Sequence, residues 1–153
     1  MKKLLLLSLS LLLVIFTVRA ADKEEGPVTW NVQVQPVSGD TYKLVINAKM
    51  KDGFHIWALE AGGDGSLINT EISLEQFDIH WVDVDWRLSK KPKTETYDYI
   101  DGAVNYFDKQ VQFSRNFTGA KGNVIKGSIT YQSCNESMCF PPEDVPFEVT
   151  IQK

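Results

Sequence analysis

The chain has two cysteines, Cys134 and Cys139, and both lie in the segment YQSCNESMCFPPEDVPFEV near its C-terminal end. The stretches before and after the pair alternate between apolar and polar residues, as strands do. We therefore expect the pair at or near the tip of a hairpin-like connection, with Cα atoms close enough for a disulfide. Two such thiols can clamp a fold, or they can exchange disulfides with another protein.

A disulfide across so short a segment constrains little of the unfolded chain. A ring of about six residues stabilises a fold by roughly 2 kcal/mol in the loop-entropy estimate, less than a bridge between distant strands would. Small exported domains nevertheless often keep disulfides that only fix loops. Composition and spacing therefore leave both interpretations open, a structural clamp and a redox centre.

Other chemistry has little support in the sequence. His55 and His80 are the only histidines, and a zinc site would need both of them to converge with both cysteines. The spacing of these four residues is not that of a common zinc finger or ribbon. The motifs GxSxG and HExxH are also absent. The sequence therefore predicts no metal, no cofactor and no hydrolase site.

The first twenty residues, MKKLLLLSLSLLLVIFTVRA, have the pattern of a secretory signal peptide. Two lysines precede an apolar run from Leu4 to Val18, and Ala20 provides a small residue before the expected cleavage site. The run is short for a membrane span, although an uncleaved N-terminal anchor is the alternative. We expect a signal peptide at residues 1–20 and one mature domain at residues 21–153.

The mature chain is acidic. Cleavage removes Lys2, Lys3 and Arg19, which leaves 13 basic against 20 acidic side chains and a formal charge of −7. Such a surface repels nucleic acid and anionic lipid, so neither is an expected partner. We also expect no membrane insertion after signal cleavage, because no other apolar stretch approaches the length of a membrane span. Export to an oxidising compartment would allow the cysteines to pair.

The rest of the chain predicts an all-β fold. About nine short segments alternate with period two and are separated by turn residues. They are Val28–Val34, Tyr42–Met50, Phe54–Leu59, Leu67–Leu74, Phe77–Trp86, Val104–Phe107, Val111–Phe117, Val124–Tyr131 and Val145–Ile151. An immunoglobulin-like antiparallel β-sandwich accommodates this many strands in one domain. The polar stretch from Lys90 to Gly102 has no clear alternation and is expected to be a long loop.

Three segments, in order along the chain, resemble the N-terminal periplasmic domain of DsbD, the transmembrane thiol-disulfide reductase of Gram-negative bacteria. The cysteine segment resembles the active-site pattern of that family, in which Tyr-Gln precedes the first cysteine and an aromatic or aliphatic residue and two prolines follow the second. DGFHIWAL and YDYIDGAVNYFDKQVQF resemble two further segments. The chain departs from the family in having four residues between its cysteines, where family members have five.

The resemblance implies an immunoglobulin-like fold and a role in electron transfer. The domain would be a protein-disulfide reductase that relays electrons through Cys134 and Cys139 between thioredoxin-fold proteins of the periplasm, such as disulfide isomerases and cytochrome c maturation factors. By position, Cys139 corresponds to the cysteine that joins the partner and Cys134 to the one that resolves the mixed disulfide. The competing hypothesis is a non-catalytic immunoglobulin-like binding module with a structural disulfide.

The resemblance also implies which residues surround the pair. A loop at Tyr97–Asp101 would cover the disulfide, with Tyr99 or Ile100 as the shielding side chain. Asp98 would keep a thiol protonated, because a nearby carboxylate disfavours a second negative charge. Further neighbours of the site are His55, Trp57 and Phe140.

The membrane part of DsbD and its C-terminal thioredoxin-like part have no counterpart in these 153 residues. We therefore expect the domain to work with a separate membrane thiol reductase.

Overall fold

The computed structural model describes residues 26–75 and 78–152. The predicted signal peptide at residues 1–20 lies outside these ranges, and it remains a prediction. Across the described residues the chain forms twelve strands and no helix. This part of the chain accordingly has no helix long and apolar enough to cross a membrane.

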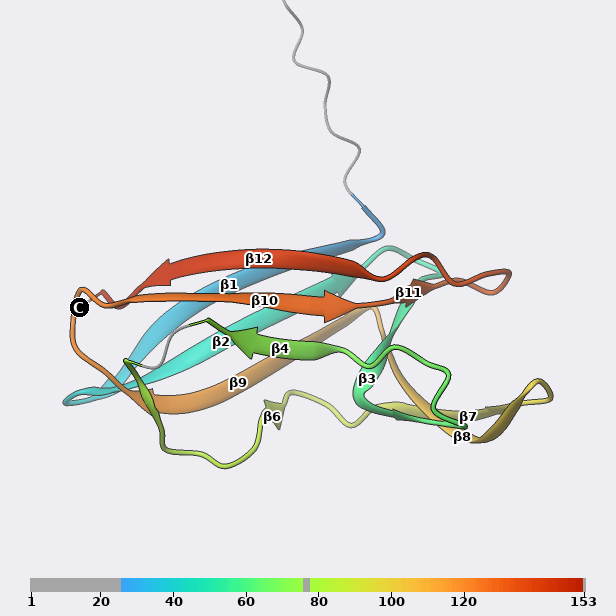
Figure 1. Cartoon of the computed structure of the whole chain (residues 1–153), viewed down its shortest axis with the longest axis horizontal. Coiled ribbons are helices and arrows are strands. Elements are labelled where there is room, and N and C mark those ends of the chain that lie inside the picture. Colours follow the sequence, from blue (N-terminus) through green and yellow to red (C-terminus); the bar gives the residue numbers. More distant parts are fainter. Residues whose placement is uncertain (1–25, 76–77, 153) are drawn as a thin grey trace, which may run out of the picture.

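The strands form three antiparallel sheets (Figure 1). The first sheet contains β1 (Val28–Ser38), β2 (Thr41–Met50) and β9 (Gln110–Thr118), with β5 (His80–Trp81) and β6 (Arg87–Leu88) along the outer edge of β9. The second contains β12 (Glu143–Thr150), β10 (Val124–Tyr131) and β4 (Glu71–Leu74). The third contains β11 (Ser133–Cys134), β3 (His55–Gly62), β8 (Ile100–Asp108) and β7 (Lys93–Tyr97).

The main core lies between the first two sheets and also includes Ile56, Ala58 and Phe107 of the third. Trp30 of β1 contacts Tyr131 of β10 across the layers, with ring centroids 5.2 Å apart. Leu44, Ile46 and Phe113 of the first sheet are fully buried in the same cluster as Ile129 of the second. The predicted immunoglobulin-like antiparallel β-sandwich is therefore confirmed.

The alternation that predicted these strands corresponds to their burial. In β10, Ile125, Gly127, Ile129 and Tyr131 are buried, while the residues that alternate with them are only partly buried. Val111, Phe113 and Phe117 of β9 face the core in the same way. The alternation of residues with period two is clear in both strands because one face of each strand packs against the opposite sheet.

The prediction of a long loop over Lys90–Gly102 was wrong. Residues Lys93–Tyr97 form β7, which pairs with β8 as a hairpin. The sequence KTETY shows no alternation because β7 is the edge strand of its sheet and its first four residues are exposed. A strand without a buried face carries no period-two signal.

The continuous strands predicted at Phe77–Trp86 and Leu67–Leu74 were also wrong in extent. Phe77 lies outside the described residues, and only β5 and β6 pair with β9 in this region. Between them the carboxylate of Asp83 accepts a hydrogen bond from the amide of Asn116 at 2.9 Å, so a side chain replaces a strand partner there. The other strand begins only at Glu71.

The third sheet lies at one end of the sandwich, where Figure 1 shows the β7–β8 hairpin and β11. The chain leaves β10 at Tyr131 and enters β11 at Ser133, where it pairs with β3 instead of β12. This change of sheet brings the first cysteine into the third sheet.

Candidate functional site

Cys134 and Cys139 form a disulfide at this end of the molecule. Their sulfur atoms are 2.01 Å apart and their Cα atoms 3.9 Å apart. The cysteines face each other across an isolated antiparallel bridge, inside the connection between the paired strands β10 and β12. The hairpin-like placement predicted from the sequence is therefore confirmed.

Asn135 shapes the loop between the cysteines. Its side-chain Oδ1 accepts hydrogen bonds from the amides of Ser137 and Met138, each at 2.9 Å. Its own amide donates to the carbonyl of Met138, also at 2.9 Å. An asparagine that bonds the backbone two and three residues ahead stabilises a tight turn, so this loop holds the two sulfur atoms together.

The two cysteines differ in exposure. Cys134 is 1% exposed and packs with Trp57, Ala61 and Val104 in a second, smaller cluster apart from the main core. Cys139 is exposed. The sulfur that a partner protein could reach directly is therefore that of Cys139.

Strand β3 places His55 and Trp57 beside the disulfide. His55 is the direct partner of Cys134 in the pairing of β3 with β11. Trp57 is 3% exposed, and its Nε1 donates a hydrogen bond to Oε1 of Gln132 at 3.2 Å. Trp57 thus belongs both to the small cluster and to the wall of the site.

The His55 ring contacts two aromatic side chains. Its centroid is 5.0 Å from that of Trp57 and 5.0 Å from that of Tyr106. Its Nε2 atom is buried and has no hydrogen-bond partner among the described residues. Burial lowers the pKa of His55 below its usual value, although the carboxylates of Glu95 and Asp108 act in the opposite direction.

The segment Tyr97–Asp101, expected to cover the disulfide, forms the turn of the β7–β8 hairpin. Tyr99 is 79% exposed and lines the same cavity as the cysteines. Ile100 packs against the buried cluster that contains Cys134. Asp98 is exposed on the turn and does not line the cavity.

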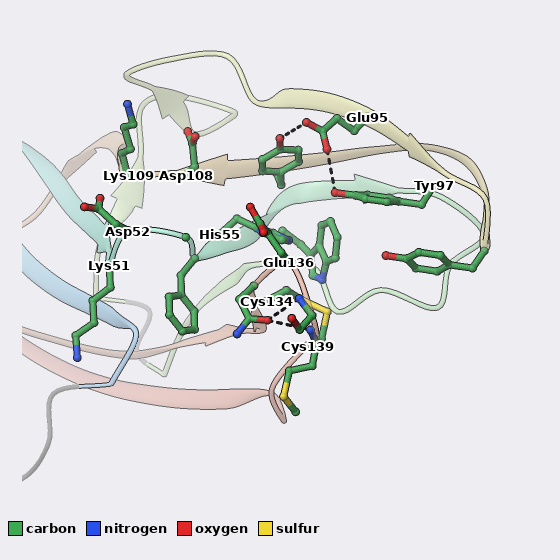
Figure 2. A pocket seen from close by; sticks show the side chains of 18 residues that line it. Lys51, Asp52, His55, Glu95, Tyr97, Asp108, Lys109, Cys134, Glu136 and Cys139 are labelled. Carbon is green, nitrogen blue, oxygen red and sulfur yellow. Dashed lines mark hydrogen bonds between the residues drawn. A yellow bond between two sulfur atoms is a disulfide. The ribbon is translucent and has the colours of Figure 1, made fainter.

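The cavity of about 650 Å³ lies between the hairpin and the disulfide loop. Figure 2 shows Glu95 and Tyr97 on one side of it, Cys134 and Cys139 on the other, and Lys51, Asp52 and Lys109 at one end. His55 and Trp57 also contribute to its lining. Aromatic rings and charged groups therefore surround the disulfide on its open side.

Glu95 links the strands of the hairpin through its carboxylate. It accepts hydrogen bonds from the hydroxyl of Tyr106 and, at 3.0 Å, from the hydroxyl of Tyr97. These bonds lower the pKa of Glu95, with Tyr106 the larger cause. Burial, with the nearby Glu95, raises the pKa of Tyr97 to about 12, so both hydroxyls stay protonated donors at neutral pH.

Asp108, the last residue of β8, forms a second charged group. It accepts hydrogen bonds from Nζ of Lys93 at 2.6 Å and from Nζ of Lys90 at 3.4 Å. The bond from Lys93 is the main cause that lowers the pKa of Asp108. Asp108 is also the direct strand partner of His55, so this ion pair lies next to the imidazole.

Phe140 directly follows Cys139 in the chain. Its ring centroid is 5.7 Å from that of Phe54, and its amide donates a hydrogen bond to the carbonyl of Ser133 at 2.8 Å. It does not line the cavity. In the part of the chain that the structure describes, no three histidine, cysteine or acidic side chains gather as potential metal ligands.

The sequence did not single out Glu95, Tyr106 or Asn135 as site residues. Glu95 and Tyr106 face each other only through the β7–β8 pairing, which was not expected because β7 was predicted as loop. Asn135 had a readable signal, since an asparagine two residues before a serine in a short loop favours a side-chain-stabilised turn.

Comparison with protein families gives a match over most of the chain. The family described as "Thiol:disulfide interchange protein DsbD, N-terminal" matches residues 24–151. No curated protein matches the sequence significantly.

Among solved structures, the N-terminal periplasmic domain of ScsB from Proteus mirabilis is similar, with 15% sequence identity and a TM-score of 0.62. The match covers 86% of this chain and 49% of that one, so this chain spans about half the length of that relative. At this identity the similarity is one of fold.

Two Neisseria meningitidis structures are also similar. The DsbD N-terminal domain in its reduced form has 19% identity and a TM-score of 0.47, with 80% of this chain and 86% of that one covered. A complex of the DsbD and PilB N-terminal domains has 21% identity and a TM-score of 0.45, with 78% and 80% covered.

Proposed function

Since this chain belongs to the family of the DsbD N-terminal domain, we propose that it is a thiol-disulfide exchange protein of the periplasm. It relays electrons through Cys134 and Cys139 between thioredoxin-fold proteins. A separate membrane thiol reductase supplies the electrons, and periplasmic thioredoxin-fold proteins receive them. This activity makes it a protein-disulfide reductase without a cofactor.

The observation that carries the proposal is the unequal exposure of the two cysteines in the disulfide. Cys139 is exposed beside the cavity, while Cys134 is 1% exposed beneath it. Exchange requires one sulfur that a partner can reach and a second that can attack only after the first has reacted. The unequal exposure of the two cysteines supports Cys139 as the attacking and Cys134 as the resolving cysteine.

In the reduced protein the thiolate of Cys139 attacks one sulfur of the partner's disulfide. A mixed disulfide forms, and the partner's other sulfur leaves as a thiolate. The thiolate of Cys134 then attacks the sulfur of Cys139, which releases the partner's first sulfur and regenerates the Cys134–Cys139 disulfide. Two electrons have passed to the partner, and the membrane reductase restores the dithiol by the reverse steps.

The β7–β8 turn restricts access to the buried sulfur of Cys134 in this proposal. Ile100 packs over the cluster that contains Cys134, and Tyr99 stands at the mouth of the cavity. An apolar cover excludes chance thiols, and a docking partner can displace an exposed turn.

A structural disulfide in a binding module is the second candidate. The observation in its favour is that Cys134 is part of a buried apolar cluster, so the bridge also contributes to packing. The two candidates differ in the reduction potential that they require.

Capture of the partner tests the proposed function. A Cys134→Ser variant can attack through Cys139 but cannot resolve the mixed disulfide, so it should accumulate covalent complexes with thioredoxin-fold proteins in a periplasmic extract. The matched control is Cys139→Ser, whose remaining thiol is buried and should capture much less. If neither single-cysteine variant forms a mixed disulfide with any such protein, the proposal is wrong.

A further inference from the structure

His55 lies directly beside the buried cysteine. It is the strand partner of Cys134 in the antiparallel pairing of β3 with β11. Side chains of directly opposed residues point to the same face of a sheet, with Cβ atoms about 4.5–5.5 Å apart. Both residues line the cavity, and Figure 2 shows His55 between the β7–β8 hairpin and Cys134.

The imidazole is held as a neutral base with an unused nitrogen. Nε2 is buried and unpartnered among the described residues, and burial lowers the pKa of His55 below its usual value of 6.5. The ring is therefore largely unprotonated at neutral pH. The rings of Trp57 and Tyr106, each 5.0 Å from the imidazole between centroids, pack against it and restrict its orientation.

The charged groups that face His55 favour its protonated form once a proton arrives. Glu95 of β7 and Asp108 of β8 both raise the pKa of His55 against the effect of burial. Asp108 is shared with Lys90 and Lys93, and Glu95 is held by Tyr106 and Tyr97. From the disulfide loop, Glu136 lines the same cavity. The surroundings are thus mostly acidic on the hairpin side.

Cys134 needs a proton acceptor that Cys139 does not need. Burial disfavours a thiolate, and a thiol that is 1% exposed has little water to receive its proton. The exposed thiol of Cys139 can release its proton directly to solvent. The second step of exchange is therefore the one that the fold itself would hinder.

We propose that His55 accepts the proton of the Cys134 thiol during the step that closes the disulfide, an inference that rests on the exchange function proposed above. As the sulfur of Cys134 attacks that of Cys139, its proton passes to Nε2 of His55. The S–S bond to the partner breaks, and the partner's sulfur leaves with the electron pair as a thiolate. The imidazolium then loses its proton to that thiolate or to water in the cavity.

A chromogenic aromatic disulfide, dithiobis(nitrobenzoate), separates the two steps without a protein partner. The reduced protein should release one nitrothiobenzoate when Cys139 attacks and a second when Cys134 closes the ring, so stopped-flow absorbance reports two phases. The Cys134→Ser variant should show only the first phase.

His55→Gln should slow the second phase by roughly 10²-fold at neutral pH, in the range lost when a general base is removed. It should leave the rate of the first phase unchanged. In the unsubstituted protein the rate of the second phase should rise with pH as His55 loses its proton, and the variant should lack this rise. At strongly alkaline pH the Cys134 thiol ionises without a base, so the second-phase rates of the variant and of the unsubstituted protein should converge. His80→Gln is the matched control, because His80 is exposed in β5, far along the chain from the site.

An unchanged second phase in His55→Gln would overturn the inference. So would a slowing of equal size at every pH, because a structural disturbance gives that result. The outcome does not depend on the natural partner, so it stays separate from the capture experiment. If extracts yield no mixed disulfides while His55→Gln slows ring closure, the exchange function fails and the role of His55 stands.

Discussion

At the scale of single residues, the two cysteines have the same chemistry and different surroundings. Cys134 packs against Trp57, Ala61 and Val104, whereas Cys139 follows a turn made by Asn135 and faces solvent. The order of attack proposed above follows from this difference in exposure. The spacing of the cysteines in the sequence could not have provided it.

Glu95 provides a pH-dependent test of the hairpin side of the site. Its pKa is lowered in the folded protein, mainly by the hydrogen bond from Tyr106. A carboxyl group with a lowered folded pKa adds stability above its unfolded pKa of about 4.3, and this stability is lost as the pH falls through the folded pKa.

Tyr106→Phe should therefore lower the melting temperature at neutral pH, and the difference from the unsubstituted protein should shrink in acid as Glu95 becomes protonated. Thermal denaturation at neutral pH and at about pH 3, below the unfolded pKa, measures this. Tyr97→Phe, which removes the smaller cause, should show a smaller effect of the same sign. A difference that stays constant over this pH range would contradict the account.

At the scale of elements, the β7–β8 turn rests on a glycine of the loop after β3. Gly63 has a φ of 69°, and an added Cβ would lie 2.9 Å from Cγ2 of Ile100 and 3.2 Å from Cγ1 of Val104. Gly65 has a φ of 85° with nothing within 4 Å of an added Cβ. The two glycines thus carry similar backbone strain when substituted, but only one touches the turn.

Gly63→Ala should displace Ile100 and open the cover of the disulfide. Reduction by dithiothreitol should accelerate by roughly threefold to tenfold, which corresponds to about 1 kcal/mol. Gly65→Ala is the control, and it should cost a similar roughly 1–2 kcal/mol of stability from the left-handed backbone. Equal reduction rates in the two variants would show that the turn does not control access.

Elements with one buried face could be predicted from the sequence, and the others could not. The alternation of β10 is strong because Ile125, Ile129 and Tyr131 pack into the core. The sequence of β7 gave no such signal, since an exposed edge strand has no face to distinguish. The contact between Glu95 and Tyr106 depends on that strand, so it needed the structure.

At the scale of the whole molecule, the disulfide lies apart from the main core. The core cluster between the first two sheets contains neither cysteine, and Cys134 belongs to the smaller cluster at the end of the sandwich. We therefore expect the sandwich to stay folded when the disulfide is reduced. A ring this local contributes roughly 2 kcal/mol, so a large loss of stability on reduction is not expected.

The proposed exchange function requires this separation. A domain that depended on its disulfide for folding would unfold in half of its working cycle. The resemblance of the cysteine segment predicted disulfide exchange in advance, whereas the placement of Cys134 in a cluster separate from the main core became visible only with the three sheets in place.

Redox titration of the Cys134–Cys139 pair tests the central claim most directly. Equilibration with glutathione or dithiothreitol buffers, followed by alkylation and mass measurement, gives the reduction potential of the pair. The exchange function predicts a potential in the range of known exchange proteins, about −120 to −270 mV. A potential below about −300 mV, typical of structural disulfides, would contradict it and favour the binding module.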